Sequence, residues 1–451
     1  MALKTPGVYI NEINAFPNSV VAVATSIPVF IGYTEKAESN GKSLFKQPVA
    51  INSLPDFELF FGKQPAMKYD LQAAEVNASD VVLDNKGFNL IPQAELYLYN
   101  SMRLFYANGG GQCYVISLDS YVNRLSKTPV LADFTGIFPV LQDMPDITML
   151  VFPDALALGN DYYTFASQAI DLCGQMQNCI ALVDVLYTRD NNYDNAINEF
   201  RKNVQSSFLN YGAAYFPWLN TTVVLSGEVD VASVNDYSAC IKSEGDLTAL
   251  QNALRANMNC LPPSAAMAGV MTAVDNAQGV WKAPANVALV NVSSPVVKIN
   301  DQEQQTLNVD ILSGKSINAL RSFPTQGVLV WGARTLEGNS QDWRYINVRR
   351  TMIMIEQSIK LAARAYVFEA NDANTWTNLK SSLENFLNGL WQQGALAGAK
   401  PEEAYTVSVG LGTTMTAQDI LNGYMIVNVL VAIAHPAEFI AITFQQQMQQ
   451  S

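Results

Sequence analysis

The sequence predicts a multidomain protein of mixed α/β architecture. Short apolar runs typical of buried strands alternate with helical patterns between residues 148 and 218. A further apolar run at 328–331 is followed by a glycine and two long helical patterns. With 451 residues, the chain is long enough for two or three domains with sizeable cores. We expect five segments, which are 1–20, 21–90, 91–263, 264–435 and 436–451.

Composition favours a protein whose surface is largely covered by partners. Hydrophobic residues make up 49% of the chain and charged residues only 15%, so few charges are left for a free surface. A well-packed large monomer is the alternative. The net charge of −13 argues against nucleic acid as a partner, because phosphate binding requires clustered lysines and arginines and the sequence has no basic stripe.

The five cysteines predict free thiols in a reducing cytoplasm. They are odd in number and irregularly spaced, none forms a CxxC pair, and the chain has a single histidine, His435, so a zinc site is not expected. The N-terminal residues contain no charged leader followed by a long apolar run, so no secretion signal is predicted. The most apolar stretch, 425–434, is about half the length of a membrane-spanning helix and predicts a buried strand.

An extended arm is expected at the N-terminus. Residues 1–20 place the strand-forming triplet Val8, Tyr9 and Ile10 between two prolines, with no hairpin partner nearby. This strand therefore pairs with a distant strand of its own domain or with another chain. The next patterns predict a buried strand pair at 20–33, a short helix at 54–62, a surface insertion at 64–89, a helix at 91–108 and a buried strand at 113–117.

The middle of the chain predicts an α/β layer with parallel strands. Strands are expected at 148–152, 180–186 and 213–218, and helices at 162–176 and 192–208. Because open α/β sheets often bind ligands at strand ends, an enzyme with a site in 91–260 is an alternative function. Asp154 and Asp184 could pair there as carboxylates, although isolated aspartates at strand ends more often act as caps. No glycine-rich phosphate loop follows any of these strands, and the Gly-Lys-Ser triplets at 41–43 and 314–316 lack the preceding glycine of a nucleotide-binding loop.

The last two fifths of the chain predict a core of two helices and several strands. Pro262 and Pro263 mark 251–268 as a connection, and the acidic stretch 301–310 reads as an exposed loop. A helix is expected at 347–368, and Asp372 or Asn374 would cap a second one. The remaining patterns predict strands at 287–292, 404–409, 425–434 and 438–444, a helix at 417–423 capped by Thr416, and a polar tail at 445–451.

A series of motifs resembles the contractile tail sheath proteins of phage tails and of phage-tail-like injection particles. TPGVYINEI (5–13), IPVFIGYTEKA (27–37) and FYANGGGQCYVI (105–116) stand in the first half. WGARTLEGNSQDWRYINVRR (331–350) and VGLGTTMTAQDILNG (409–423) follow in the order of that family. The resemblance covers both ends and most of the middle. It is weakest at 64–89 and at 119–145.

The resemblance implies a structural subunit rather than an enzyme, without a cofactor or a metal. Sheath proteins form stacked rings of six subunits around an inner tube, and the sheath contracts to drive the tube through a target envelope. The implied partners are further copies of the chain, the inner tube protein, and baseplate and terminal cap proteins, with neither nucleic acid nor direct membrane insertion. A specialised copy near the baseplate or cap is the alternative. Assembly is expected in the bacterial cytoplasm, with the particle released by lysis or retained in the cell.

The resemblance also implies where subunits meet. Sheath subunits exchange their terminal strands with neighbours, so main-chain hydrogen bonds connect the lattice. The residues expected in these strands are Val8, Tyr9, Ile10, Phe439, Ile440, Ile442 and Phe444.

Further candidate contacts lie between the two arms. Gln418, Asp419 and Asn422 are expected to face the inner tube, with a solvated helix face as the alternative. Arg349, Arg350 and Glu356 are candidates for ionic contacts between subunits, although Arg349 and Glu356 are two helical turns apart and could bind each other. His435 stands where relatives often have an arginine, which predicts a slight pH sensitivity of contraction.

Overall fold

The computed structural model describes residues 20–124, 129–186 and 193–439. The chain forms two compact units, and the boundary between them falls within helix α12 (Ile346–Ala363). The larger unit contains residues 24–353 and the segment that begins at His435, and the smaller unit contains residues 354–434 with the described residues before Ala24. Helices and strands occur in both units, which confirms the predicted mixed α/β class. The five predicted segments divide the chain differently and stay a prediction.

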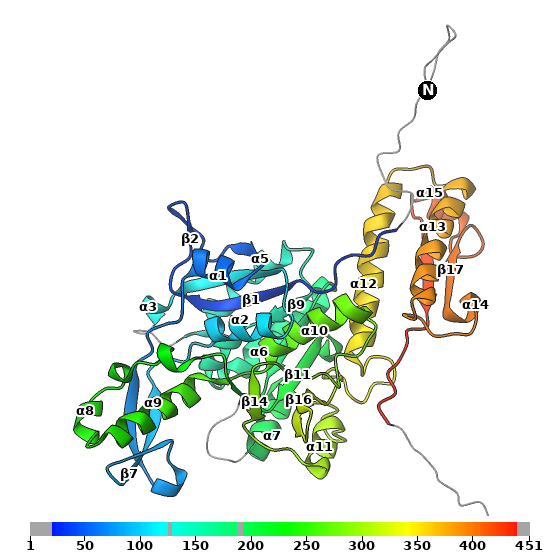
Figure 1. The fold of residues 1–451 in the computed structure, drawn as a ribbon. Helices are drawn as coiled ribbons and strands as arrows, with labels where there is room; N and C mark the ends of the chain where they lie inside the picture. The colour runs from blue at the N-terminus through cyan, green and yellow to red at the C-terminus, as the bar shows by residue number, and fades with distance from the viewer. Residues whose placement is uncertain (1–19, 125–128, 187–192, 440–451) are drawn as a thin grey trace, which may run out of the picture. The chain divides into compact units, whose positions relative to one another are not determined.

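An eight-stranded sheet lies at the centre of the larger unit (Figure 1). Its inner strands are parallel to their neighbours, as the sequence predicts, and each edge strand is antiparallel to the strand beside it. The order in space is β16 (Gly327–Val330), β15 (Asn318–Phe323), β11 (Gly212–Phe216), β10 (Ile180–Asp184), β9 (Met149–Val151), β1 (Pro28–Thr34), β8 (Cys113–Ser120) and β4 (Pro48–Ile51).

Helices from several parts of the chain pack on this sheet. The chain runs from β9 through α6 (Asp161–Met176) to β10 and through α7 (Tyr193–Asn203) to β11, which confirms the predicted alternation. Helix α2 (Leu98–Ala107) contacts β1 and also packs against α10 (Ser264–Gln278). The two helices approach closely at Gly269, where an added Cβ atom would lie 2.5 Å from the backbone oxygen of Phe105. A residue without a side chain is therefore needed at that position.

Shorter elements complete the larger unit. Helix α1 (Leu54–Phe61) ends at Gly62, as predicted, and its first turn is capped by the side chain of Ser53. Strands β12 (Leu219–Thr221), β13 (Cys260–Leu261) and β14 (Val292–Pro295) form a small sheet, and β2 (Glu38–Ser39) pairs with β3 (Lys42–Ser43). The other short helices are α3 (Tyr121–Arg124), α4 (Leu131–Thr135), α5 (Phe138–Gln142) and α8 (Tyr237–Cys240).

Two segments that are distant in the sequence build a second, smaller core. Strands β5 (Tyr69–Ala74), β7 (Lys86–Pro92) and β6 (Val81–Leu83) form a sheet against α9 (Glu244–Met258). The core between them contains Tyr69, Val81, Leu83, Leu90, Val234, Leu250 and Leu254. The prediction of a simple surface insertion at 64–89 was therefore incomplete. The prediction of a connection at 251–268 was wrong, because α9 and α10 occupy most of it on either side of the two prolines.

Other predictions for the larger unit were wrong in detail. Helix α11 (Asp301–Asn308) replaces the expected exposed loop, and it begins with a capping box in which Asn300 and Glu303 bind each other's backbone N–H groups. Only β1 forms within the strand pair expected at 20–33. Helix α2 starts seven residues after the predicted position 91, since β7 extends to Pro92. At 287–292 a single bridge at Ala288 stands in place of a strand, and β14 begins at Val292.

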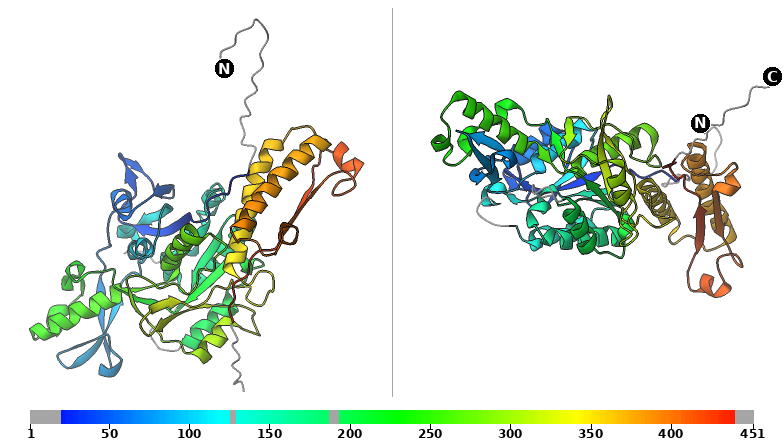
Figure 2. Two further views of the ribbon diagram at one scale, coloured as in Figure 1. Left: turned by 45° about the vertical axis from the view of Figure 1, so that its right-hand side comes forward. Right: turned by 90° about the horizontal axis from the view of Figure 1, so that it is seen from below.

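The smaller unit contains two long helical segments and a two-stranded sheet (Figure 2). Helix α13 (Ala373–Gln392) begins where Asp372 accepts hydrogen bonds from two backbone N–H groups, which confirms one of the two predicted caps. Strand β17 (Tyr405–Val409) pairs with β18 (Val427–Val431) and packs on α13, and two short helices, α14 (Pro401–Ala404) and α15 (Ala417–Leu421), flank β17. The expected buried strand at 425–434 is shorter, and its residues alternate between half-buried and exposed.

Candidate assembly site

The sheet of β17 and β18 has the properties of a strand-binding edge. Among the described residues no further strand pairs with either of them, so each has one side open to another chain. The sequence of β18, VNVLV, contains neither proline nor a charged residue, the usual protections against edge pairing. Leu430, the fourth residue of this strand, is 69% exposed. A two-stranded sheet of this kind gains stability when further strands are added.

Most residues expected in the exchanged strands lie outside the described parts of the chain. This applies to Val8, Tyr9 and Ile10 at the N-terminus and to Ile440, Ile442 and Phe444 at the C-terminus. Phe439 is described, and its ring is 76% exposed. Strand exchange therefore stays a prediction for both arms.

The short helix α15 presents polar groups near the open sheet. Thr416 accepts a hydrogen bond from the backbone N–H of Asp419, and Asp419 accepts one in return from the backbone N–H of Thr416, as the predicted cap requires. The backbone bond from Thr416 lowers the pKa of Asp419. Gln418 donates to the side chain of Asn422 at 3.1 Å, and both residues are exposed. The inner tube as the partner of this face stays a prediction.

The candidate ionic residues on α12 have partners within their own chain. Arg350 is buried and binds Asp275 of α10 through two hydrogen bonds of 2.9 and 2.6 Å. The guanidinium of Arg349 is also buried and lies 4.6 Å from the ring centre of Tyr211. Glu356 is exposed. The contacts of the two arginines are intramolecular in this structure, and an inter-subunit role for the three residues stays a prediction.

The carboxylates at the strand ends act as helix caps. Asp154 accepts hydrogen bonds from the backbone N–H groups of Tyr97 and Leu98, where α2 begins. Asp184 accepts from the backbone N–H of Ser264, the first residue of α10. Both side chains are buried, and the hydrogen bonds to the helix ends give each of them a structural role. In the described parts of the chain, no group of three or more His, Cys, Asp and Glu residues is placed to hold a metal ion.

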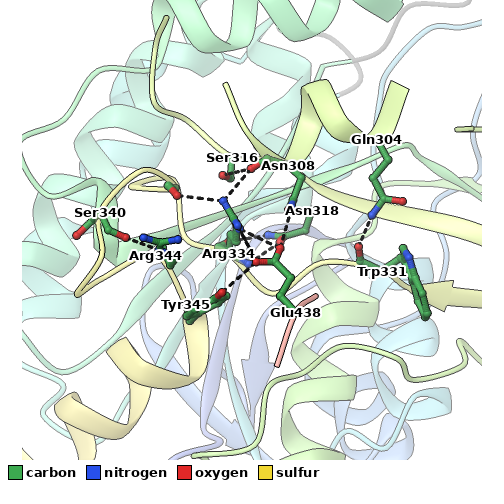
Figure 3. A network of polar contacts seen from close by, with 11 residues as sticks. Gln304, Asn308, Ser316, Asn318, Trp331, Arg334, Ser340, Arg344, Tyr345 and Glu438 are labelled. Carbon is green, nitrogen blue, oxygen red and sulfur yellow. Dashed lines mark hydrogen bonds and ion pairs between the residues drawn. The ribbon is translucent and has the colours of Figure 1, made fainter. Parts of the chain in front are cut away.

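A second group of polar contacts was not anticipated from the sequence (Figure 3). The carboxylate of Glu438 receives three hydrogen bonds from the guanidinium of Arg334, at 3.0 and 3.2 Å from Nε and at 2.6 Å from Nη2. It receives further bonds from Asn308 at 2.7 Å and Tyr345 at 3.0 Å. The ring of His435 contacts Tyr345 edge-on, with ring centres 5.8 Å apart. The only sequence signal was an acidic residue at the start of the strand expected at 438–444, within the predicted C-terminal arm 436–451.

Two domains of the chain match models of known protein families. Residues 153–336 match the family model for the phage tail sheath protein central domain, and residues 339–447 match that for the phage tail sheath C-terminal domain. A curated relative, the tail sheath protein of Salmonella phage ViI, is 26% identical over 145 residues, which are 32% of this chain and 22% of the relative. The chain thus aligns with about a fifth of the length of that relative.

Two solved structures match almost the entire chain. The sheath complex of the extracellular contractile injection system PVC, in the contracted state, is 31% identical with a TM-score of 0.69, over 99% of both chains. The helical sheath of the anti-feeding prophage, also contracted, is 30% identical with a TM-score of 0.69, over 99% of this chain and 100% of the other. No helix within the described residues combines the length and apolarity needed to cross a membrane. Taken with the two domain matches, this near-complete similarity shows that the chain belongs to the contractile tail sheath protein family.

Proposed function

We propose that this chain is the repeating subunit of a contractile sheath around an inner tube. In this proposal, rings of six subunits stack into a cylinder, and contraction of the cylinder drives the tube through a target envelope. The observation that carries the proposal is the pair β17 and β18, which has two open edges and an uncharged outer strand. Terminal strands from neighbouring subunits would extend this small sheet by main-chain hydrogen bonds.

Contraction would be a change between two packings of the same subunits. Contacts between rings would differ in the two states, while exchanged strands would keep neighbouring subunits connected throughout. A difference in buried surface, multiplied over many copies, would supply the driving free energy. No nucleotide is required at the moment of contraction.

The partners follow from this arrangement. The exposed polar groups of Gln418 and Asn422 would make weak contacts with the inner tube, which suits a sheath that must slide over it. Baseplate and terminal cap proteins would bind the two ends of the cylinder. Assembly would take place in the bacterial cytoplasm, with the particle released by lysis.

A specialised copy beside the baseplate is a second candidate function. The chain is as similar to a chain in the baseplate structure of the anti-feeding prophage, with 30% identity and a TM-score of 0.67 over 99% of its length, as it is to sheath chains. Such a copy would require a template to assemble. The repeating subunit would polymerise without one.

Electron microscopy of the protein expressed alone distinguishes these functions. We expect high-speed pelleting to recover hollow striated cylinders, because contacts between identical subunits would suffice for growth. A soluble monomer at all concentrations would contradict the role of repeating subunit. Cylinders that form only after purified baseplate is added would favour the specialised copy.

A further inference from the structure

The carboxylate of Glu438 is held by side chains from three separate parts of the larger unit. Asn308 ends α11, Arg334 follows β16, and Tyr345 directly precedes α12. Each carboxylate oxygen accepts from the guanidinium and from one further donor, because Asn308 binds Oε1 and Tyr345 binds Oε2. We name these three residues the carboxylate socket. Its paired guanidinium bonds are the geometry in which arginine binds a carboxylate most strongly.

The socket is rigid on the side opposite the carboxylate. The Nη1 atom of Arg334 donates to the backbone oxygens of Gly338 and Asn308, at 3.2 and 3.4 Å. The side chain of Arg334 is only 4% exposed, whereas that of Glu438 is 20% exposed. Because Nη1, the one nitrogen that does not bind Glu438, is held in this way, the guanidinium cannot turn towards another partner without breaking buried hydrogen bonds.

The socket is also joined to the central sheet. The backbone N–H of Arg334 donates to the side chain of Asn318 in β15 at 2.7 Å, and that side chain donates back to the backbone oxygen of Arg334 at 2.8 Å. The same Asn318 amide reaches the backbone oxygen of Ala214 in β11 at 3.0 Å. Hydrogen bonds therefore connect Glu438 through Arg334 and Asn318 to two neighbouring strands of the sheet. Figure 3 shows Glu438, Arg334 and Asn318 side by side.

We infer that the carboxylate socket anchors the root of the C-terminal arm and transmits tension on that arm to the central sheet. The inference rests on the proposed function, in which residues 440–451 bind a neighbouring subunit. Glu438 stands two residues before this stretch, so a pull on the arm reaches the socket first. Without the socket, the same pull would act through the chain on β18, which ends at Val431 and belongs to the sheet that receives strands from neighbours.

Charge is essential to this anchorage. Burial alone would raise the pKa of Glu438, but the hydrogen bonds from Arg334 and Asn308 outweigh burial and lower it. The group is therefore ionised at neutral pH. Replacement of Glu438 by glutamine keeps the size of the side chain, but it removes the charge and turns one acceptor into a donor that faces donors.

The test compares Glu438→Gln with the wild-type chain and with Glu38→Gln as a control. Glu38 forms an exposed ion pair with Lys36 at 3.6 Å, so its replacement removes the same charge without a socket. Hydrogen exchange of the full-length chain, kept below the concentration at which it polymerises, monitors two backbone amides. That of Arg334 donates to the side chain of Asn318, and that of Gly338 donates to the backbone oxygen of Gly314. We expect their exchange to accelerate at least about tenfold in Glu438→Gln, with unchanged exchange in α6 and in the control.

A second measurement addresses tension. Sheaths assembled from Glu438→Gln should break at lower shear than wild-type sheaths, whereas Glu38→Gln sheaths should match the wild type. Arg334→Lys should behave like Glu438→Gln, because lysine keeps the charge but cannot form the paired bonds. Unchanged exchange in Glu438→Gln would overturn the anchorage, and unchanged resistance to shear would overturn the transmission of tension. A wild-type chain that forms no sheath would contradict the proposed function, and the exchange measurement would still decide the anchorage.

Discussion

At the scale of single residues, Asp184 caps helix α10 and has a raised pKa. The carboxylate lies at the end of β10, only 3% exposed, and binds the first backbone N–H of α10. Burial raises its pKa to about 7, against the opposing effect of the hydrogen bonds from Ser264. The neutral form of Asp184 is therefore favoured in the folded chain at pH values where the unfolded chain carries the charge.

The pH dependence of unfolding tests this assignment. Because the folded pKa is raised, stability from this group is fully present below the unfolded pKa and is lost as pH rises through about 7. Between pH 5.5 and pH 8 we expect the wild-type chain to lose up to about 2 kcal/mol relative to Asp184→Asn, which keeps the acceptor oxygen but cannot ionise. Denaturant unfolding at both pH values measures the difference. Parallel changes in the two proteins would show that Asp184 does not titrate in this range.

At the scale of secondary-structure elements, β18 is an edge strand that pairs on one side only among the described residues. Leu430, the fourth of its five residues, is 69% exposed, so an added strand or subunit could cover its apolar side chain. Strand β18 is held by its pairing with β17. Directly after β18, the backbone N–H of Ala432 donates to the backbone oxygen of Ala404, which directly precedes β17. The fold of the single chain therefore depends little on what covers the outer edge.

Replacement of Leu430 by lysine should prevent assembly without unfolding the protomer. A lysine on an edge strand opposes the addition of a further strand, and the exposed position tolerates the charge. We expect the pelleted fraction to fall at least about tenfold, with a melting temperature within about 2 °C of the wild type. The control is Leu59→Lys in α1, where the leucine is 66% exposed. Normal pelleting of Leu430→Lys would argue against β18 as the receiving edge.

Elements with local sequence signals could be predicted, and those defined by distant contacts could not. The parallel strands β9, β10 and β11 are continuous apolar runs, and α13 has an aspartate cap and repeated leucines, so both appear in the sequence itself. Helix α11 was missed because Leu307 is its only buried residue and its polar composition outweighed the capping box.

The candidate site shows the same limit. The Thr416 cap of α15 is local and was predicted. The carboxylate socket joins Glu438 to Arg334 across 104 positions of the chain, and to Asn308 at the end of the helix that was missed. The small core between β5, β7 and α9 depends in the same way on two segments far apart in the sequence. No periodic pattern records such pairings, because each partner alone reads as an ordinary surface residue or a short insertion.

At the scale of the whole molecule, folding of the protomer and assembly of the sheath depend on different parts of the chain. Residues 20–124, 129–186 and 193–439 contain both cores, the edges of the small sheet and the socket, whereas the strands proposed for exchange lie largely at 1–15 and 440–451. The protomer should therefore fold without either terminal segment. Polymerisation should require both, because loss of either would leave one edge of the small sheet unpaired in every subunit.

The most direct test of strand exchange is sedimentation of a chain that lacks residues 440–451, beside the full-length protein at equal concentration. We expect the full-length protein to pellet as cylinders. The shortened chain should remain soluble, with the same circular dichroism spectrum and the same cooperative unfolding. A shortened chain that pellets to the same extent and forms the same cylinders would show that the C-terminal arm does not connect the subunits.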